Sequence, residues 1–156
     1  MNKEQQIFWE EFKKQNSNLA EINFGHAWGF GDSSEMADRL ANLVLKGEKT
    51  TTTGSLIEYE IVNEKVPEVD MTLFDILLNG SDKPVAILRT TNIFVTPFSK
   101  VTEEHAYKEG EGDKTLSYWR MSHETYWKRI FKELNIDIDI PTMDVVCEEF
   151  EVFWKP

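Results

Sequence analysis

Gly47-Glu48-Lys49-Thr50-Thr51-Thr52 marks the point where this 156-residue chain changes from a predicted helix to a predicted strand. The preceding residues 32–46 favour a helix, because Met36, Leu40 and Val44 recur at four-residue spacing and form one apolar stripe. A glycine directly after this segment suits the left-handed conformation in which many helices end, and consecutive threonines favour extended backbone. We therefore expect an abrupt helix exit that leads into a strand.

Lys49 and Thr52 are the candidate reactive pair in this stretch. Positions three apart in a regular strand point to opposite faces, so we expect the chain still to be turning between these two residues. A lysine acts as a base only where burial or a nearby positive charge brings its pKa towards neutrality. The alternative interpretations are a solvent-exposed lysine and a threonine that serves only as a strand former.

Periodicity, capping residues and turn signals predict the other elements. A helix capped by Asp32 or Ser33 is expected at 32–46, a first helix at 4–15 with Ile7, Phe8 and Phe12 buried, and a helical turn at 102–108. A long helix is expected at 115–134, with Leu116, Trp119, His123, Trp127, Ile130 and Leu134 on its apolar face. Strands are expected at 55–62, 72–79, 84–96 and 144–154, and a turn at 79–82 makes a hairpin. The sequence therefore predicts one α+β domain.

Five segments in the same order resemble the ASCH domain, a small β-barrel family related to PUA-like RNA-binding domains. The G-x-K-x-x-T stretch at 47–52 is similar to the family signature, and 27–32 (Ala-Trp-Gly-Phe-Gly-Asp) resembles the family's entry to the following helix. Segments 84–98, 109–123 and 146–152 resemble its paired strands, acidic loop with aromatic helix, and closing strand. The resemblance implies a single PUA-like mixed β-barrel with packed helices over 1–156, with an N-terminal helix at about 3–15 and the barrel and its helices at about 20–155.

The resemblance also implies a reaction. Some small bacterial ASCH proteins are amidohydrolases of acylated cytidine that use a lysine, a threonine and a glutamate, and the matching residues here are Lys49, Thr52 and Glu109. In that scheme the lysine takes the proton of the threonine hydroxyl, which attacks the amide, and the glutamate protonates the departing amine. Glu111 is the alternative acid. Other family members bind or cleave RNA, which is the alternative function.

Five more residues are candidates for substrate binding. Trp28 and Phe30 lie in a glycine-rich segment, where they are expected either to stack on a base or to plug one end of the barrel. Tyr118 and Arg120 fall outside the apolar stripe of their helix and are expected to face a ligand. Arg89 is expected to contribute to a basic groove, together with Lys46, Lys49 and Arg120.

Charge and composition favour a small ligand over a long polyanion. The formal net charge is −11, from 17 basic and 28 acidic residues, and nucleic-acid binders are usually basic. Charge therefore favours a small, weakly charged ligand. The family resemblance implies that this partner is a small nucleoside-like molecule, with single-stranded RNA as the alternative. The sequence carries no signal for an oligomeric state.

Cysteine, histidine and hydropathy patterns set the remaining expectations. One cysteine, Cys147, allows no internal disulfide, which fits a reducing cytoplasm, and its strand-like surroundings favour burial. The three histidines lack the spacing of common zinc motifs, so neither a metal nor another cofactor is expected. No apolar run suits a membrane span, and the first residues do not resemble a signal peptide. We expect a cytoplasmic protein without a membrane partner.

Overall fold

The computed structural model describes residues 1–156, and their contacts group into two compact units. The first unit comprises Met1–Glu48, Val69–Asn92 and Phe150–Pro156, and the second comprises Lys49–Glu68 and Ile93–Glu149. Because strands β4 (Pro84–Pro97) and β5 (Asp144–Trp154) each run from one unit into the other, the units are not two successive stretches of sequence. The single domain inferred from the sequence stays a prediction.

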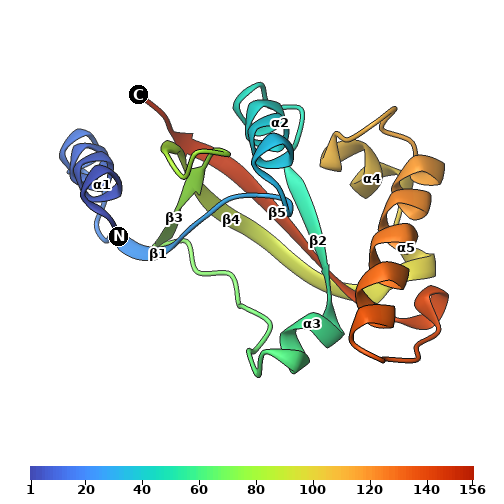
Figure 1. Ribbon diagram of the computed structural model, residues 1–156. Helices are drawn as coiled ribbons and strands as arrows, with labels where there is room; N and C mark the ends of the chain where they lie inside the picture. Colours follow the sequence, from blue (N-terminus) through green and yellow to red (C-terminus); the bar gives the residue numbers. More distant parts are fainter. The chain divides into compact units, whose positions relative to one another are not determined.

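The strands form one five-stranded mixed sheet in the order β1-β3-β4-β5-β2 (Figure 1). Strand β1 (Asn23–Trp28) runs parallel to β3 (Leu73–Leu78), β3 and β4 form the expected antiparallel hairpin, and β2 (Thr51–Ser55) runs antiparallel to β5. The α+β class is confirmed. The expected barrel is corrected: strands β1 and β2 are the two edges of the sheet, so the sheet is open and does not close into a barrel.

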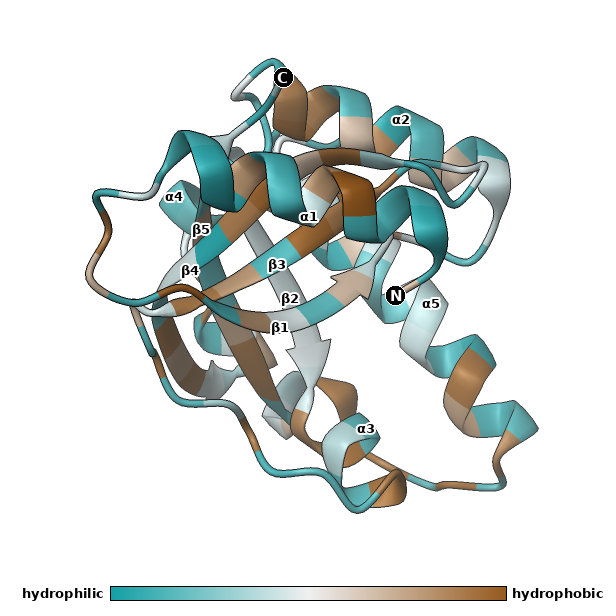
Figure 2. Cartoon of the chain, turned by 90° about the vertical axis from the view of Figure 1, so that its left-hand side faces the viewer, coloured by the Kyte–Doolittle hydropathy of each residue, from teal (hydrophilic) through white to brown (hydrophobic).

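Helix α1 (Lys3–Gln15) lies in the first unit and is amphipathic (Figure 2). Asn2 and Gln5 form a capping box at its start. Its buried side carries Phe8, Trp9 and Phe12, which pack with Phe74, Ile76 and Ile87 of strands β3 and β4. Ile7, expected on this side, is 61% exposed, so that expectation was wrong, and Trp9 takes its place in the core.

Helix α2 (Ser34–Leu45) confirms the predicted helix within two residues at its start and one at its end. Ser33 caps it by accepting a hydrogen bond from the Met36 amide. At its other end, Gly47 has φ of +75°, and the amides of Gly47 and Glu48 donate to the carbonyls of Val44 and Leu43. These two bonds make a Schellman motif, which fixes the direction in which the chain leaves the helix towards Lys49.

Three helices build the second unit together with β2. Helix α3 (Leu56–Ile61) corrects the strand expected at 55–62: Ser55 caps it and Glu58 closes a capping box, so the strand ends at Ser55. Helix α4 (Glu103–Glu109) is capped by Thr102 as expected and ends at Gly110 with φ of +74°. Helix α5 (Leu116–Glu133) confirms the long helix and is capped by Thr115.

The core of the second unit forms around the apolar face of α5. Trp119, Trp127 and Phe131 pack there with Phe98 and with Cys147, which lies on β5 and is completely buried. Leu134 is 48% exposed because the helix ends before it, which corrects its expected place in the apolar stripe. None of the helices has the length and apolar character needed to cross a bilayer.

Candidate active site

Lys49 is the buried centre of a polar cluster in the second unit, and its side chain is only 1% exposed. Its Nζ donates to the carbonyl of Thr51 at 2.9 Å, to Oε2 of Glu111 at 3.2 Å and to the carbonyl of Glu109 at 3.4 Å. It also lies 3.9 Å from Oε1 of Glu109. Lys49 therefore faces several oxygen acceptors, and its charge is balanced by two carboxylates.

Glu109, the last residue of α4, is the buried carboxylate of this cluster. Its Oε2 accepts hydrogen bonds from Nε1 of Trp119 and, at 3.0 Å, from the hydroxyl of Thr53, while Oε1 lies 3.2 Å from Nε2 of His123. Burial alone would raise the pKa of Glu109, but hydrogen bonds from two histidines and the charge of Lys49 hold it well below its usual value. Glu109 is therefore ionised at neutral pH.

Thr51 and Thr53 connect strand β2 to helix α4. Alternate residues of a strand share a face, so both side chains point towards α4. The Thr51 hydroxyl donates to the carbonyl of His105 at 3.3 Å, and the Thr53 hydroxyl lies 2.7 Å from Nε2 of the same histidine. The amide of Thr50 donates to the carbonyl of Lys108 at 2.8 Å, which fixes the start of the strand against the helix.

Thr52, the predicted nucleophile, lies between these two threonines on β2. By strand alternation its side chain points to the other face, which it shares with its register partner Glu148. Glu148 accepts a hydrogen bond from the Tyr59 hydroxyl at 3.3 Å, and burial together with this carboxylate raises the pKa of Tyr59. The structure thus brings Lys49 and Glu109 together but directs the Thr52 side chain away from them.

His123 extends the cluster from helix α5. Its Nδ1 lies 2.9 Å from the carbonyl of Trp119, one turn earlier, and its ring stacks on the Trp119 indole with centroids 4.2 Å apart. Burial alone would lower the pKa of His123, but the hydrogen bond and the charge of Glu109 raise it above its usual value. The residue expected to be a core histidine is therefore bonded to the candidate catalytic carboxylate.

The loop after α4 positions Glu111, whose side chain is 25% exposed and pairs with Lys49. Tyr118, from the first turn of α5, packs so closely on Gly112 that a Cβ there would lie 2.3 Å from its ring. Arg120 donates from Nη2 to the carbonyl of Ser99 at 3.0 Å. Of these predicted ligand-facing residues, Glu111 contacts the Lys49 cluster directly.

Trp28 and Phe30 belong to the first unit, where they contact each other edge-to-face at 4.6 Å. Phe30 is 6% exposed and packs with Leu40 and Phe150 in an apolar cluster. Trp28 is half-buried, and its indole Nε1 donates to Oδ2 of Asp75 at 3.0 Å. Both rings therefore have structural contacts within their own unit.

Arg89, also in the first unit, is held by its own neighbours. Its Nε and Nη2 donate to Oε1 of Glu151 at 2.9 and 2.7 Å, and its guanidinium lies 4.5 Å from the ring centre of Phe153. An arginine that is already paired with a carboxylate and stacked on an aromatic ring is a weaker candidate for binding phosphate.

The sequence interpretation missed Thr53, His105 and the bond between His123 and Glu109. A local signal existed for each histidine, since His105 and Glu109 are four residues apart on α4 and Trp119 and His123 are four apart on α5. Strand alternation at 51 and 53 was the corresponding signal on β2. The contact of β2 with α4 has no signature in the sequence, because its partners are 52 to 56 residues apart. The contact of α4 with α5 joins Glu109 and His123 across the loop between these helices, and spacing within one helix does not reveal it.

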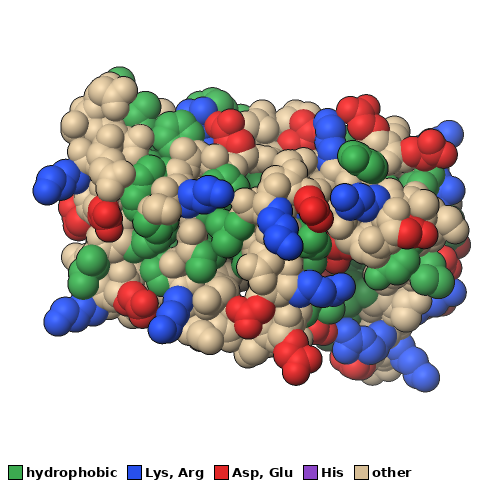
Figure 3. Space-filling view, turned by 90° about the horizontal axis from the view of Figure 1, so that it is seen from above, with side chains coloured by type: hydrophobic (Ala, Val, Ile, Leu, Met, Phe, Trp, Pro, Cys, Tyr) green, Lys and Arg blue, Asp and Glu red, His purple; other side chains and the backbone are tan.

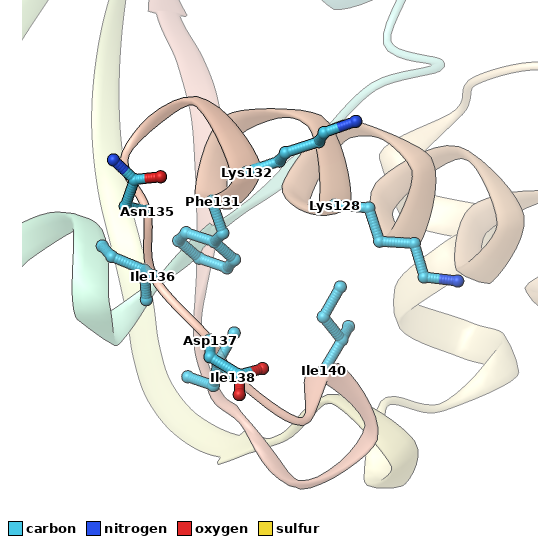
Figure 4. A pocket seen from close by; sticks show the side chains of 8 residues that line it. All are labelled: Lys128, Phe131, Lys132, Asn135, Ile136, Asp137, Ile138 and Ile140. Atoms are coloured by element: carbon cyan, nitrogen blue, oxygen red, sulfur yellow. The ribbon is translucent and has the colours of Figure 1, made fainter.

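The structure arranges no three histidine, cysteine, aspartate or glutamate side chains as a site for a metal ion. An open pocket of about 400 Å³ lies at the end of α5, away from the Lys49 cluster (Figure 4). Lys128 and Lys132 lie at its edge, and Phe131, Ile136 and Ile140 provide apolar surface. None of the predicted site residues lines this pocket.

Comparisons with known proteins give a consistent result. The family model described as ASCH domain matches residues 26–153. A solved ASCH domain from Lactobacillus crispatus is 28% identical, with coverage of 97% of this chain and 95% of that one and a TM-score of 0.82. A solved protein from Enterococcus faecalis is 37% identical, with coverage of 97% and 89% and a TM-score of 0.83. No match was found among curated proteins.

Proposed function

Since the chain belongs to the ASCH domain family, we propose that it hydrolyses the amide of a small acylated nucleoside at the Lys49 cluster. The substrate class comes from the family resemblance, and the chemistry comes from the cluster itself. The observation that carries the proposal is the buried pairing of Lys49 with Glu109 and Glu111.

Buried charge is the reason to assign chemistry to this cluster. Removing an ammonium and a carboxylate from water costs several kcal/mol per ion, and apolar side chains of similar volume are often at least as stabilising. Ionisable groups with strongly shifted pKa values concentrate at functional sites for this reason. The low pKa of Glu109 and the burial of Lys49 therefore support an active site.

The hydroxyl that geometry favours as nucleophile is that of Thr53. It already donates to the ionised Glu109 at 3.0 Å, within the range expected for a nucleophile and its base. Trp119 and His123 orient that base from α5. The family resemblance implies Thr52 instead, so the two neighbouring threonines are competing assignments within one proposal.

In the proposed reaction, Glu109 first accepts the proton of the threonine hydroxyl and then donates it to the leaving group. The hydroxyl oxygen attacks the amide carbonyl carbon while its proton moves to Glu109, and Lys49 stabilises the negative charge on the carbonyl oxygen. The C–N bond then breaks, and Glu109 donates this proton to the departing amine. Water cleaves the acyl-threonine ester, passing its proton back through Glu109 to the threonine oxygen.

Turnover of acylated nucleosides by wild type and three variants tests the proposal. Lys49→Ala should lower kcat/KM by at least about 100-fold, the effect typical of losing one oxyanion donor. Thr53→Val should abolish turnover and Thr52→Val should retain it, since valine removes the hydroxyl with little change in shape. The reverse result would assign the nucleophile to Thr52, and the absence of wild-type turnover on any acylated nucleoside would refute the proposal.

RNA binding is less well supported. Arg89 is paired with Glu151, Arg120 is bonded to Ser99, and Lys49 is buried, so three expected contributors to a basic groove have other partners. Acidic and basic side chains are interspersed over the face shown in Figure 3. Strong binding of single-stranded RNA that weakens steeply with added salt would favour the RNA alternative.

A further inference from the structure

We infer that His123 is held as an imidazolium in the folded protein and that it positions the Glu109 carboxylate for the proposed reaction. The second part of this statement rests on the proposed function. The first part concerns the protonation state of one side chain, and it stands on the geometry of the second unit alone.

Both ring nitrogens of His123 face acceptors. Nδ1 lies 2.9 Å from the carbonyl oxygen of Trp119, which has no proton to give. Nε2 lies 3.2 Å from Oε1 of Glu109, whose other oxygen already accepts from Trp119 and Thr53. A neutral imidazole carries one N–H and would point a lone pair at one of these oxygens. Only the doubly protonated ring satisfies both contacts.

The surrounding charges favour the same state. Glu109 on α4 and Glu111 in the following loop are the carboxylates that act on His123, and both favour its cationic form. Lys49 and His105 also bond or pair with Glu109, and Lys49 helps to keep that carboxylate ionised. The indole of Trp119 stacks on the ring of His123, a position in which an aromatic face attracts a cation.

The cation has a direct consequence for Glu109. The hydrogen bond from His123 is one of the reasons that the pKa of Glu109 lies below its usual value. It therefore helps to keep Glu109 in the ionised form that accepts the threonine proton. The bond also fixes Oε1, which leaves Oε2 directed at Thr53. When His123 loses a proton, one of its two contacts must break, and the carboxylate loses part of this support.

Nitrogen-15 NMR of the three histidines tests the protonation state without any substrate. At about pH 7.5, where an unperturbed histidine is mostly neutral, both ring nitrogens of His123 should show the shifts of protonated nitrogen. Loss of the signal in His123→Gln assigns it. A neutral His123 signal at this pH would overturn the inference.

The pH profile of hydrolysis tests the positioning role. Wild-type kcat/KM should fall on the alkaline side as pH rises through the raised pKa of His123. In His123→Gln this decrease at alkaline pH should be absent. Its kcat/KM should be lower by roughly 100-fold, because the base is misplaced. The decrease of kcat/KM on the acid side should move to higher pH, because the pKa of Glu109 returns towards its usual value.

The matched control is His26→Gln, which should keep the wild-type rate and profile. A folded His123→Gln protein with an unchanged rate and profile would overturn the positioning role. If wild type hydrolyses no acylated nucleoside, the proposed function and this role both fail, whereas the NMR result still decides the protonation state.

Discussion

Both units have an apolar core, but the second unit also contains a buried charged cluster. In the first unit, the rings of Phe12, Phe74 and Phe153 contact one another at centroid distances of 5.0 to 6.1 Å. The charge that touches two of these rings, the Arg89 guanidinium, is partly exposed and is paired with Glu151. In the second unit, Lys49 and Glu109 are equally buried. The Lys49 ammonium donates to the backbone carbonyl of Glu109 and lies 3.9 Å from its carboxylate. Apolar packing needs only shape and volume, whereas a buried charge needs every partner in place.

This difference predicts that the two interiors respond differently to substitution. Aromatic packing gives a favourable energy that degrades gradually as atoms are removed. A charged network fails as a whole, because each lost partner leaves another group unpaired in a low-dielectric interior. Variants of the two interiors should therefore differ in how much stability they lose and in whether a second substitution restores it.

The largest effect is expected for Lys49→Met. It removes the ammonium that pairs with both Glu109 and Glu111, and breaking a buried ion pair from one side costs about 3–5 kcal/mol in the free energy of unfolding. Urea denaturation measures this loss. The double variant Lys49→Met/Glu109→Gln should recover part of it, because one of the two carboxylates that lost the charge of Lys49 is also neutralised. A double variant that is less stable than the single one would show that the charges are not coupled.

Phe12→Ala should have the next largest effect, about 3–4 kcal/mol, since it leaves a cavity in the first unit. Hydrolysis measured well below the unfolding temperature should be unaffected, in contrast to Lys49→Met. Ile7→Ala on the exposed side of the same helix is the control and should change stability by less than about 0.5 kcal/mol. A loss of turnover in a fully folded Phe12→Ala protein would contradict the division between the two interiors.

The smallest effect distinguishes two neighbouring threonines. Thr53→Val leaves Glu109 and His105 each with one bond fewer and should cost about 1–3 kcal/mol in urea unfolding. Thr52→Val, on the other face of the strand, should change stability by less than about 0.5 kcal/mol. Equal losses for both variants would mean that the buried network does not depend on the Thr53 hydroxyl.

Local patterns predicted much of the fold. Strand β5 has the expected bounds, and the long helix α5 begins one residue after its expected start and ends one residue before its expected end. The prediction failed for β1, which is mostly polar or exposed and contains Gly25, and for α3, where β-branched neighbours outweighed the capping box at Ser55 and Glu58. Caps are therefore as informative as residue propensity in short elements.

The candidate site was only partly predictable. The family motif identified Lys49, and the resemblance of the acidic loop identified Glu109 and Glu111. It pointed to Thr52, whereas strand alternation directs the neighbouring Thr53 towards the carboxylate. The roles of His105 and His123 depend on the approach of α4 to β2 and of α5 to α4, a tertiary arrangement that spacing within one element does not encode.

Because Cys147 is buried, the reactivity of its thiol reports when the second unit opens. Burial, followed by the charge of Glu109, raises the pKa of this thiol to about 12, so little thiolate forms at neutral pH in the closed protein. As the chain has no other cysteine, every reaction with a thiol-specific reagent must follow exposure of this one position. The rate of labelling therefore measures how often strand β5 separates from the helices that cover it, under conditions where the rest of the chain stays folded.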